Sequence, residues 1–211
     1  MKKILLIGDS IRGGYDKYVK LSFDGVAQVY YPSENCRFTT YIIRNIFEWK
    51  NDICCGDDVD LVHWNAGLWD DLIVLDGKHH VSIDVYKENI ERICNLIKIL
   101  FPKAKMIFAT STPVQEELFV DYKRYNKDTE EYNAAAIDII KKYGGEINDL
   151  YGLLKDAPKE YHSDRTHFYT KEATEIITNQ VVKHIEKSLD IKGKKLDYQA
   201  LFSEKDDIVG L

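Results

Sequence analysis

Four short apolar segments and a weaker fifth strand signal alternate along the chain with longer segments of helical periodicity, and this alternation limits the fold more than any other feature of the sequence. Strands that alternate with helices usually pair in parallel, because each helix carries the chain back across one face of the sheet. We therefore predict a single-domain, flavodoxin-like, three-layer α/β fold, with a parallel sheet of about five strands in the order 2-1-3-4-5 and helices on both faces. The strands are expected at 3–7, 26–31, 60–64, 105–109 and 146–148, and the main helices at 38–49, 84–101, 129–142 and 169–189.

The length of the chain, 211 residues, fits one domain with a sizeable core. No internal repeat, linker or low-complexity tract interrupts it. We expect the domain to occupy 1–190. Residues 191–211 are polar and poorly periodic, and they are predicted only as an unassigned C-terminal tail.

The composition disfavours several classes of protein. The chain has 29 Lys and Arg against 35 Asp and Glu, a net charge of −6, whereas nucleic-acid binders are usually basic. The four cysteines lack C-x-x-C spacing, and His79 and His80 match no ligand motif, so we expect free thiols, no metal and no cofactor. The basic N-terminus precedes an apolar run shorter than the core of a signal peptide. No stretch is long enough to span a membrane, so we predict a cytoplasmic protein without membrane insertion.

Polar residues follow two neighbouring strands of the predicted sheet. Ser10 comes just after the first strand, and Asn65 just after the third. In open parallel sheets, sites form beyond the carboxyl ends of the strands, at the point where the strand order reverses. Near the other end of the chain, Asp164 precedes His167 by three residues, so both can lie on one tight turn. These residues supply a nucleophile, a base and a group that orients the base.

Four segments resemble conserved blocks of the SGNH, or GDSL-like, hydrolases. They are Gly8-Asp9-Ser10-Ile11, residues 64–70, Thr112-Pro113-Val114 and Asp164-Arg165-Thr166-His167. The resemblance implies a catalytic triad in which Ser10 is the nucleophile, His167 the general base and Asp164 the residue that orients His167. The nucleophile elbow G-x-S-x-G of α/β-hydrolases is absent, because Arg12 stands at its final glycine position.

Two blocks depart from the family pattern, and both concern the oxyanion hole. Where the third block usually reads Gly-x-Asn-Asp, this chain has Gly67-Leu68-Trp69-Asp70, so Trp69 replaces the expected asparagine. Asn65 is the nearest side chain able to supply an amide. The second block usually has a glycine, and here the Cys36 N–H is the candidate donor. We therefore predict an oxyanion and substrate-binding site formed by Cys36, Asn65, Gly67 and Trp69, together with the Ser10 N–H.

The predicted function is that of a serine esterase that removes a small, acetyl-type acyl group from a small molecule or a carbohydrate. No apolar lid is evident, and Trp64, Trp69, Tyr30 and Tyr31 could stack on a sugar. A lysophospholipase or thioesterase is the enzymatic alternative, which a long apolar groove near Trp69 would favour. A non-catalytic binding module on the same scaffold is the third possibility, supported by the two departures above. The sequence predicts neither the acyl chain length nor the oligomeric state.

Overall fold

The sheet has the predicted topology. The computed structural model describes residues 1–202 and contains a five-stranded sheet of order β2-β1-β3-β4-β5, in which all neighbouring strands are parallel. This confirms the predicted fold class. The strands are β1 (Lys2–Ile7), β2 (Ala27–Tyr30), β3 (Leu61–Trp64), β4 (Lys105–Ala109) and β5 (Glu146–Asn148).

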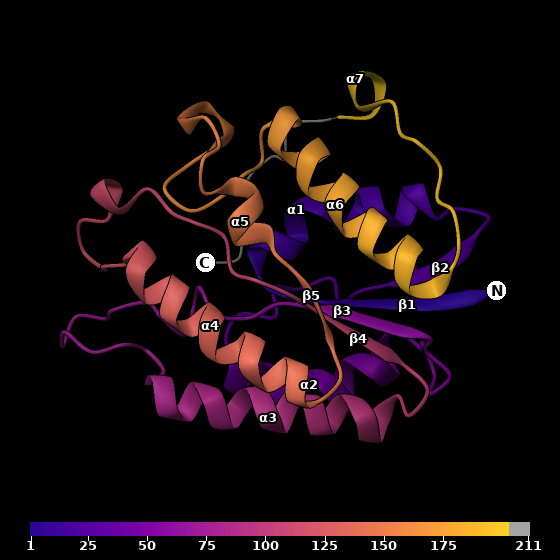
Figure 1. Ribbon diagram of the computed structural model, residues 1–211, viewed down its shortest axis with the longest axis horizontal. Helices are drawn as coiled ribbons and strands as arrows, with labels where there is room; N and C mark the ends of the chain where they lie inside the picture. The colour runs from indigo at the N-terminus through magenta and orange to yellow at the C-terminus, as the bar shows by residue number, and fades with distance from the viewer. Residues whose placement is uncertain (203–211) are drawn as a thin grey trace.

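Helices cover both faces of this sheet (Figure 1). Helices α1 and α6 pack against each other on one face, and α2, α3 and α4 pack in a row on the other. None of the helices within residues 1–202 is long and apolar enough to cross a membrane. The helices are α1 (Ser10–Ser22), α2 (Thr39–Asp52), α3 (Ile83–Leu100), α4 (Asn126–Lys142), α5 (Leu150–Leu154), α6 (Lys171–Leu189) and α7 (Tyr198–Leu201), with 3-10 turns at Glu116–Leu118 and Lys159–Tyr161.

Alternating side chains of the strands supply the two hydrophobic cores. Successive residues of a strand point to opposite faces of a sheet. In β1, Ile4 and Leu6 lie in the core beneath α1 and α6, whereas Leu5 and Ile7 lie in the core beneath α2, α3 and α4. Because both faces are covered, residues 4–7 of β1 have no polar side and appear in the sequence as a continuous apolar run.

Helix α1 is the main element that the sequence analysis did not predict. Its buried face carries Ile11, Tyr15, Tyr18 and Val19, which recur with helical spacing. The Gly13-Gly14 pair in its first turns weakens the helical signal, since glycine is a poor helix former. Packing of α1 against the sheet and α6 outweighs this low propensity.

The beginning of the predicted tail packs on the domain. The Lys194 N–H donates to the Ser22 carbonyl at 2.6 Å, at the end of α1. Tyr198 is buried, and its ring centroid lies 5.5 Å from that of Tyr18. Residues 191–202 therefore contribute to the domain that was predicted to end at 190. The rest of the predicted tail, 203–211, lies outside the described residues.

Candidate active site

The turn after β1 places the Ser10 hydroxyl at the carboxyl edge of the sheet. Asp9 caps α1: its Oδ1 accepts hydrogen bonds from the Ile11 N–H and the Asn65 Nδ2, each at 2.9 Å. The approach of Asn65 requires glycine at position 8, because a Cβ there would lie 1.9 Å from the Asn65 Oδ1. Burial raises the pKa of Asp9, although the hydrogen bonds oppose this shift. Asp9 therefore supports the turn, and Ser10 is the first residue of the helix.

His167 and Asp164 lie on one turn before α6. The Asp164 Oδ1 accepts the backbone N–H groups of Thr166 and His167, at 2.6 and 2.8 Å, and its Oδ2 accepts the His167 Nδ1–H at 2.6 Å. Burial would raise the pKa of Asp164, but these hydrogen bonds outweigh it and hold the pKa well below its ordinary value. Asp164 is thus ionised at neutral pH and fixes the tautomer of His167 with Nε2 unprotonated.

The structure brings Ser10, His167 and Asp164 into one hydrogen-bonded series. The Ser10 hydroxyl donates to the His167 Nε2 at 2.7 Å, although the two residues are 157 positions apart. Tyr169, which the sequence analysis missed, braces this arrangement. Its ring stacks on His167 with centroids 4.7 Å apart, and its hydroxyl donates to the Ser10 carbonyl at 2.7 Å. Its position two residues after His167 was the only sequence signal.

The structure engages the two expected oxyanion donors, Cys36 and Asn65, in other hydrogen bonds. The Cys36 N–H donates to the Gly8 carbonyl at 3.0 Å, so this donor connects two loops of the scaffold. The Asn65 amide nitrogen donates to Asp9, as described above, and its own N–H continues the β1–β3 pairing to Ile7 at 3.1 Å. The Gly8 carbonyl therefore takes the single Cys36 N–H away from the expected convergence point, whereas the Asn65 amide has two N–H groups and uses one of them to bind Asp9.

Gly67 and Trp69 lie on the loop that follows β3. Gly67 has a φ of +152°, and a Cβ there would lie 2.4 Å from the Ser111 Oγ, so the turn requires glycine. Its carbonyl accepts the N–H groups of Asp70 and Asp71, both at 2.8 Å. Gly67 therefore shapes the loop, whereas the Trp69 side chain lines the cavity beside Ser10.

Asp70, in the same loop, holds the start of α2. Its carboxyl accepts the Thr39 N–H at 3.1 Å and the Thr39 hydroxyl at 2.5 Å, which caps a helix that lacks a side-chain cap of its own. Asp70 is fully buried, and burial raises its pKa to about 7 despite these hydrogen bonds. Since this value exceeds the ordinary pKa of about 4, the folded state holds the proton more tightly than the unfolded state.

This difference predicts a pH dependence of stability. The tighter proton binding by Asp70 in the folded state adds to the free energy of unfolding. This contribution is fully present below about pH 4 and is lost as the pH rises through about 7. As the pH rises from 5 to 8, ionisation of Asp70 should lower the free energy of unfolding by about 2–3 kcal/mol. Asp70→Asn should lack this fall in stability, because the amide stays neutral over the same pH range. Denaturant titrations of both proteins at the two pH values measure the difference. Equal pH dependence in both would mean that Asp70 is ionised in the folded protein.

A cavity of about 900 Å³ opens beside the Ser10 hydroxyl. Most of the surface of its wall is apolar, although the lining also includes polar side chains, among them those of Arg124 and Arg165. The apolar part comes from the loops after β3 and β4: Leu68, Trp69, Leu72, Val74, Leu118 and Phe119.

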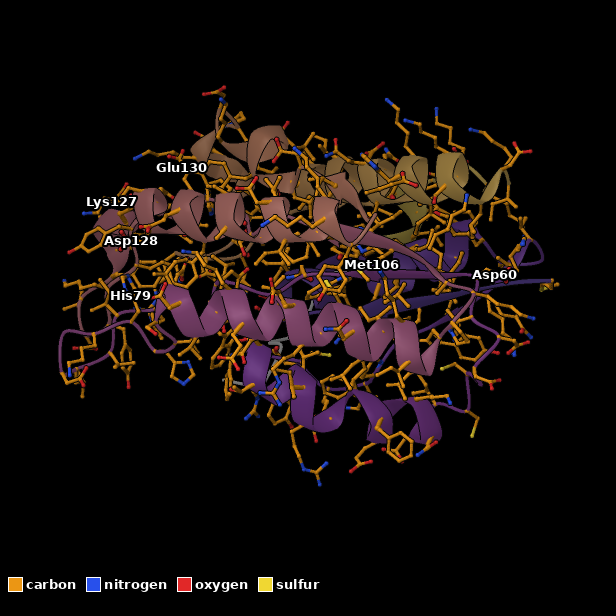
Figure 2. All side chains as sticks on the ribbon, turned by 60° about the horizontal axis from the view of Figure 1, so that its bottom comes forward. Asp60, His79, Met106, Lys127, Asp128 and Glu130 are labelled. Carbon is orange, nitrogen blue, oxygen red and sulfur yellow. The ribbon has the colours of Figure 1, made fainter. Side chains whose placement is uncertain are left out.

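The two loops that form this wall are joined to each other and to α4. Ile73 and Lys123 exchange backbone hydrogen bonds of 2.8 and 3.1 Å. His79 lies 3.2 Å from the Asp128 carboxylate, and Figure 2 shows the two side chains together at the start of α4. Within residues 1–202, no group of three or more His, Cys, Asp or Glu side chains is arranged to hold a metal ion.

The comparisons with known proteins identify the fold. No protein-family model and no curated protein sequence matches the chain. Solved structures do match. A lipase/acylhydrolase from Enterococcus faecalis has a TM-score of 0.71 at 20% identity, over 93% of this chain and 100% of that one. A GDSL-like lipase from Bacteroides thetaiotaomicron has a TM-score of 0.67 at 20% identity, over 89% of each chain. An acetyl xylan esterase, AlAXEase, has a TM-score of 0.67 at 14% identity, over 87% of this chain and 99% of that one. The chain therefore has the fold of GDSL-like lipases and acylhydrolases.

Proposed function

We propose that this protein is a serine hydrolase of carboxylic esters, with Ser10 as nucleophile, His167 as general base and Asp164 as the residue that orients His167. The observation that carries the proposal is the hydrogen-bonded series from the Ser10 hydroxyl through His167 to Asp164, with contacts of 2.7 and 2.6 Å. Its position at the carboxyl edge of a parallel sheet, beside a cavity, supports the same assignment.

The geometry allows a two-step acyl transfer. The Ser10 oxygen attacks the ester carbonyl while the His167 Nε2 takes the hydroxyl proton, and His167 then gives this proton to the departing alkoxide. Water then attacks the carbonyl of the acyl-enzyme while the His167 Nε2 takes a proton from it. His167 gives this proton to the Ser10 oxygen as the acid is released. Asp164 stabilises the imidazolium form of His167 in both steps, because its carboxylate accepts the Nδ1–H throughout.

The start of α1 offers the best donor for the oxyanion. The first N–H groups of a helix lack partners within the helix, and they lie at the positive end of its dipole. Asp9 takes the Ile11 N–H, so the neighbouring Ser10 N–H is the one next to the reacting carbonyl. We assign the oxyanion to this N–H. The Cys36 N–H would reach it only after its bond to the Gly8 carbonyl is exchanged, whereas the Asn65 amide keeps a second N–H besides the one that binds Asp9.

The apolar cavity favours a longer acyl group than acetyl. Acetyl esters of carbohydrates were the first expectation from the sequence, and one structural neighbour is an acetyl xylan esterase. An apolar groove near Trp69 was the feature expected of the lysophospholipase or thioesterase alternative, and the wall formed by Trp69, Leu72 and Phe119 is of this kind. We therefore propose that the enzyme prefers medium-chain acyl groups. A series of p-nitrophenyl esters from acetate to octanoate tests this order, and a maximum at acetate would favour the first expectation.

Labelling by a fluorophosphonate probe tests the catalytic assignment directly. Such probes phosphonylate serines that an adjacent base activates, so the folded protein should gain one adduct, and mass spectrometry should locate it on the peptide that contains Ser10. A non-catalytic binding module would remain unlabelled. An adduct on another serine, or no adduct on the folded protein, would contradict the proposal.

A further inference from the structure

Two guanidinium groups lie in the wall of the cavity, and both pack on Phe119. The Arg165 Cζ is 4.6 Å from the centre of the Phe119 ring, and the Arg124 Cζ is 5.3 Å from it. Phe119 itself is buried. The apolar wall thus carries two positive charges close to the candidate active site, in a chain whose net charge is −6.

The charge of Arg124 is already compensated. Its Nε donates to the Asp71 carboxylate at 3.0 Å, and its Nη2 donates to the Leu68 carbonyl. Both side chains of the ion pair are buried, so the pair is a fixed part of the protein interior. Arg124 therefore holds the loop after β3 against the segment that precedes α4.

Within residues 1–202, Arg165 differs from Arg124 in having no carboxylate partner. None of the ion pairs and side-chain hydrogen bonds found in residues 1–202 involves its guanidinium. Its backbone is nevertheless fixed, because its carbonyl accepts the Gln115 N–H at 2.9 Å. Of the described residues that line the cavity, only Asp164 carries a carboxylate, and His167 and two backbone N–H groups already occupy it.

We propose that Arg165 binds an anionic oxygen group of the substrate, a carboxylate or a phosphate, and so selects esters that carry a negative charge beside an apolar chain. The planar guanidinium suits both groups, since it can donate two parallel hydrogen bonds to either. The contact with Phe119 places the guanidinium in the cavity wall, and no side-chain hydrogen bond found in residues 1–202 uses its N–H groups. The proposal rests on the proposed function, because it names the substrate class of the same site.

Binding of octyl phosphate and of 1-octanol, measured by isothermal titration calorimetry, tests this assignment. The two ligands share an apolar chain and differ in charge. We expect the full-length protein to bind octyl phosphate at least about tenfold more tightly than 1-octanol, since hydrogen bonds between charged groups are the stronger kind. Arg165→Gln should reduce this ratio of affinities about tenfold. Arg165→Lys should restore only part of it, because lysine keeps the charge but lacks the paired, planar donors of the guanidinium. Lys159→Gln is the matched control: it removes an exposed positive charge that pairs with Glu117, and the ratio should not change.

The outcomes separate this proposal from the catalytic one. The role of Arg165 would be overturned if the unmodified protein bound octyl phosphate and 1-octanol with similar affinity. It would also be overturned if Arg165→Gln left the ratio of the two affinities unchanged. A salt titration of the unmodified protein provides a second measurement that needs no folded variant: the ratio should fall severalfold between about 50 mM and 500 mM KCl as the charge is screened, and a constant ratio counts against the proposal. Since calorimetry measures binding alone, a protein that fluorophosphonate does not label could still pass this test.

Discussion

Ser10→Ala should lower kcat/KM for ester hydrolysis by about 10⁴–10⁶-fold, which is the largest effect that we expect from any single substitution in this chain. The variant loses the nucleophile, and His167 keeps its place through Asp164 and the stacked Tyr169 ring. His167→Ala should be about as damaging, because the hydroxyl of an unassisted serine is a poor nucleophile. The measurement is the initial rate on p-nitrophenyl butyrate, with circular dichroism to verify folding.

The double variant decides whether the two residues act together. If the Ser10 hydroxyl and the His167 imidazole form one catalytic unit, Ser10→Ala/His167→Ala should be little worse than either single variant. Additive losses, or substantial activity in a well-folded Ser10→Ala protein, would remove the triad. Ser22→Ala is the matched control, since Ser22 ends the same helix and its hydroxyl bonds only the Tyr18 carbonyl at 2.9 Å. It should retain nearly full activity.

The fold was predictable because its determinants are local and repeated. The central strands β1, β3 and β4 are mainly apolar runs, and most helices carry an apolar stripe, so periodicity indicates most of the order of elements. Boundaries differed by up to three residues: the helix expected to begin at 129 starts at Asn126. Helix α1 was missed because the Gly13-Gly14 pair obscured its stripe, while its stability comes from long-range packing on α6.

The positions of the candidate site residues could be predicted only where the order of strands and a short sequence spacing determine them. Ser10 follows a strand and Asp164 lies three residues before His167, so topology and one turn bring them together. The oxyanion donors depend instead on where loop N–H groups point. Nothing in the sequence indicates that the Cys36 N–H donates to Gly8 or that the Asn65 amide donates to Asp9. The apolar wall escaped notice for a similar reason, since its residues come from two loops that meet only in the folded chain.

The second large effect should come from the buried ion pair between Arg124 and Asp71. Asp71 is fully buried, and besides Arg124 its carboxylate is held by the Thr129 hydroxyl at 2.6 Å. Arg124→Met would leave this carboxylate without its cation in the protein interior. Breaking a buried pair in this way typically costs about 3–5 kcal/mol, because an uncompensated charge remains. We expect a loss of this size in the free energy of unfolding at pH 8, measured by denaturant titration.

Three further measurements distinguish this explanation from a simple packing defect. Burial raises the pKa of Asp71 and the Arg124 charge lowers it, so removal of Arg124 must raise it further. A raised carboxyl pKa contributes stability that is lost as the pH rises, and the cost of Arg124→Met should therefore be smaller at pH 5 than at pH 8. Arg124→Met/Asp71→Asn should be more stable at pH 8 than Arg124→Met alone. Arg44→Met removes an arginine from an exposed pair with Glu48 and should cost less than about 1 kcal/mol. The loss in the free energy of unfolding would be due to packing if Arg124→Met lost the same amount at both pH values and Asp71→Asn did not restore any of it. The charge of Asp71 would then have no role in the loss.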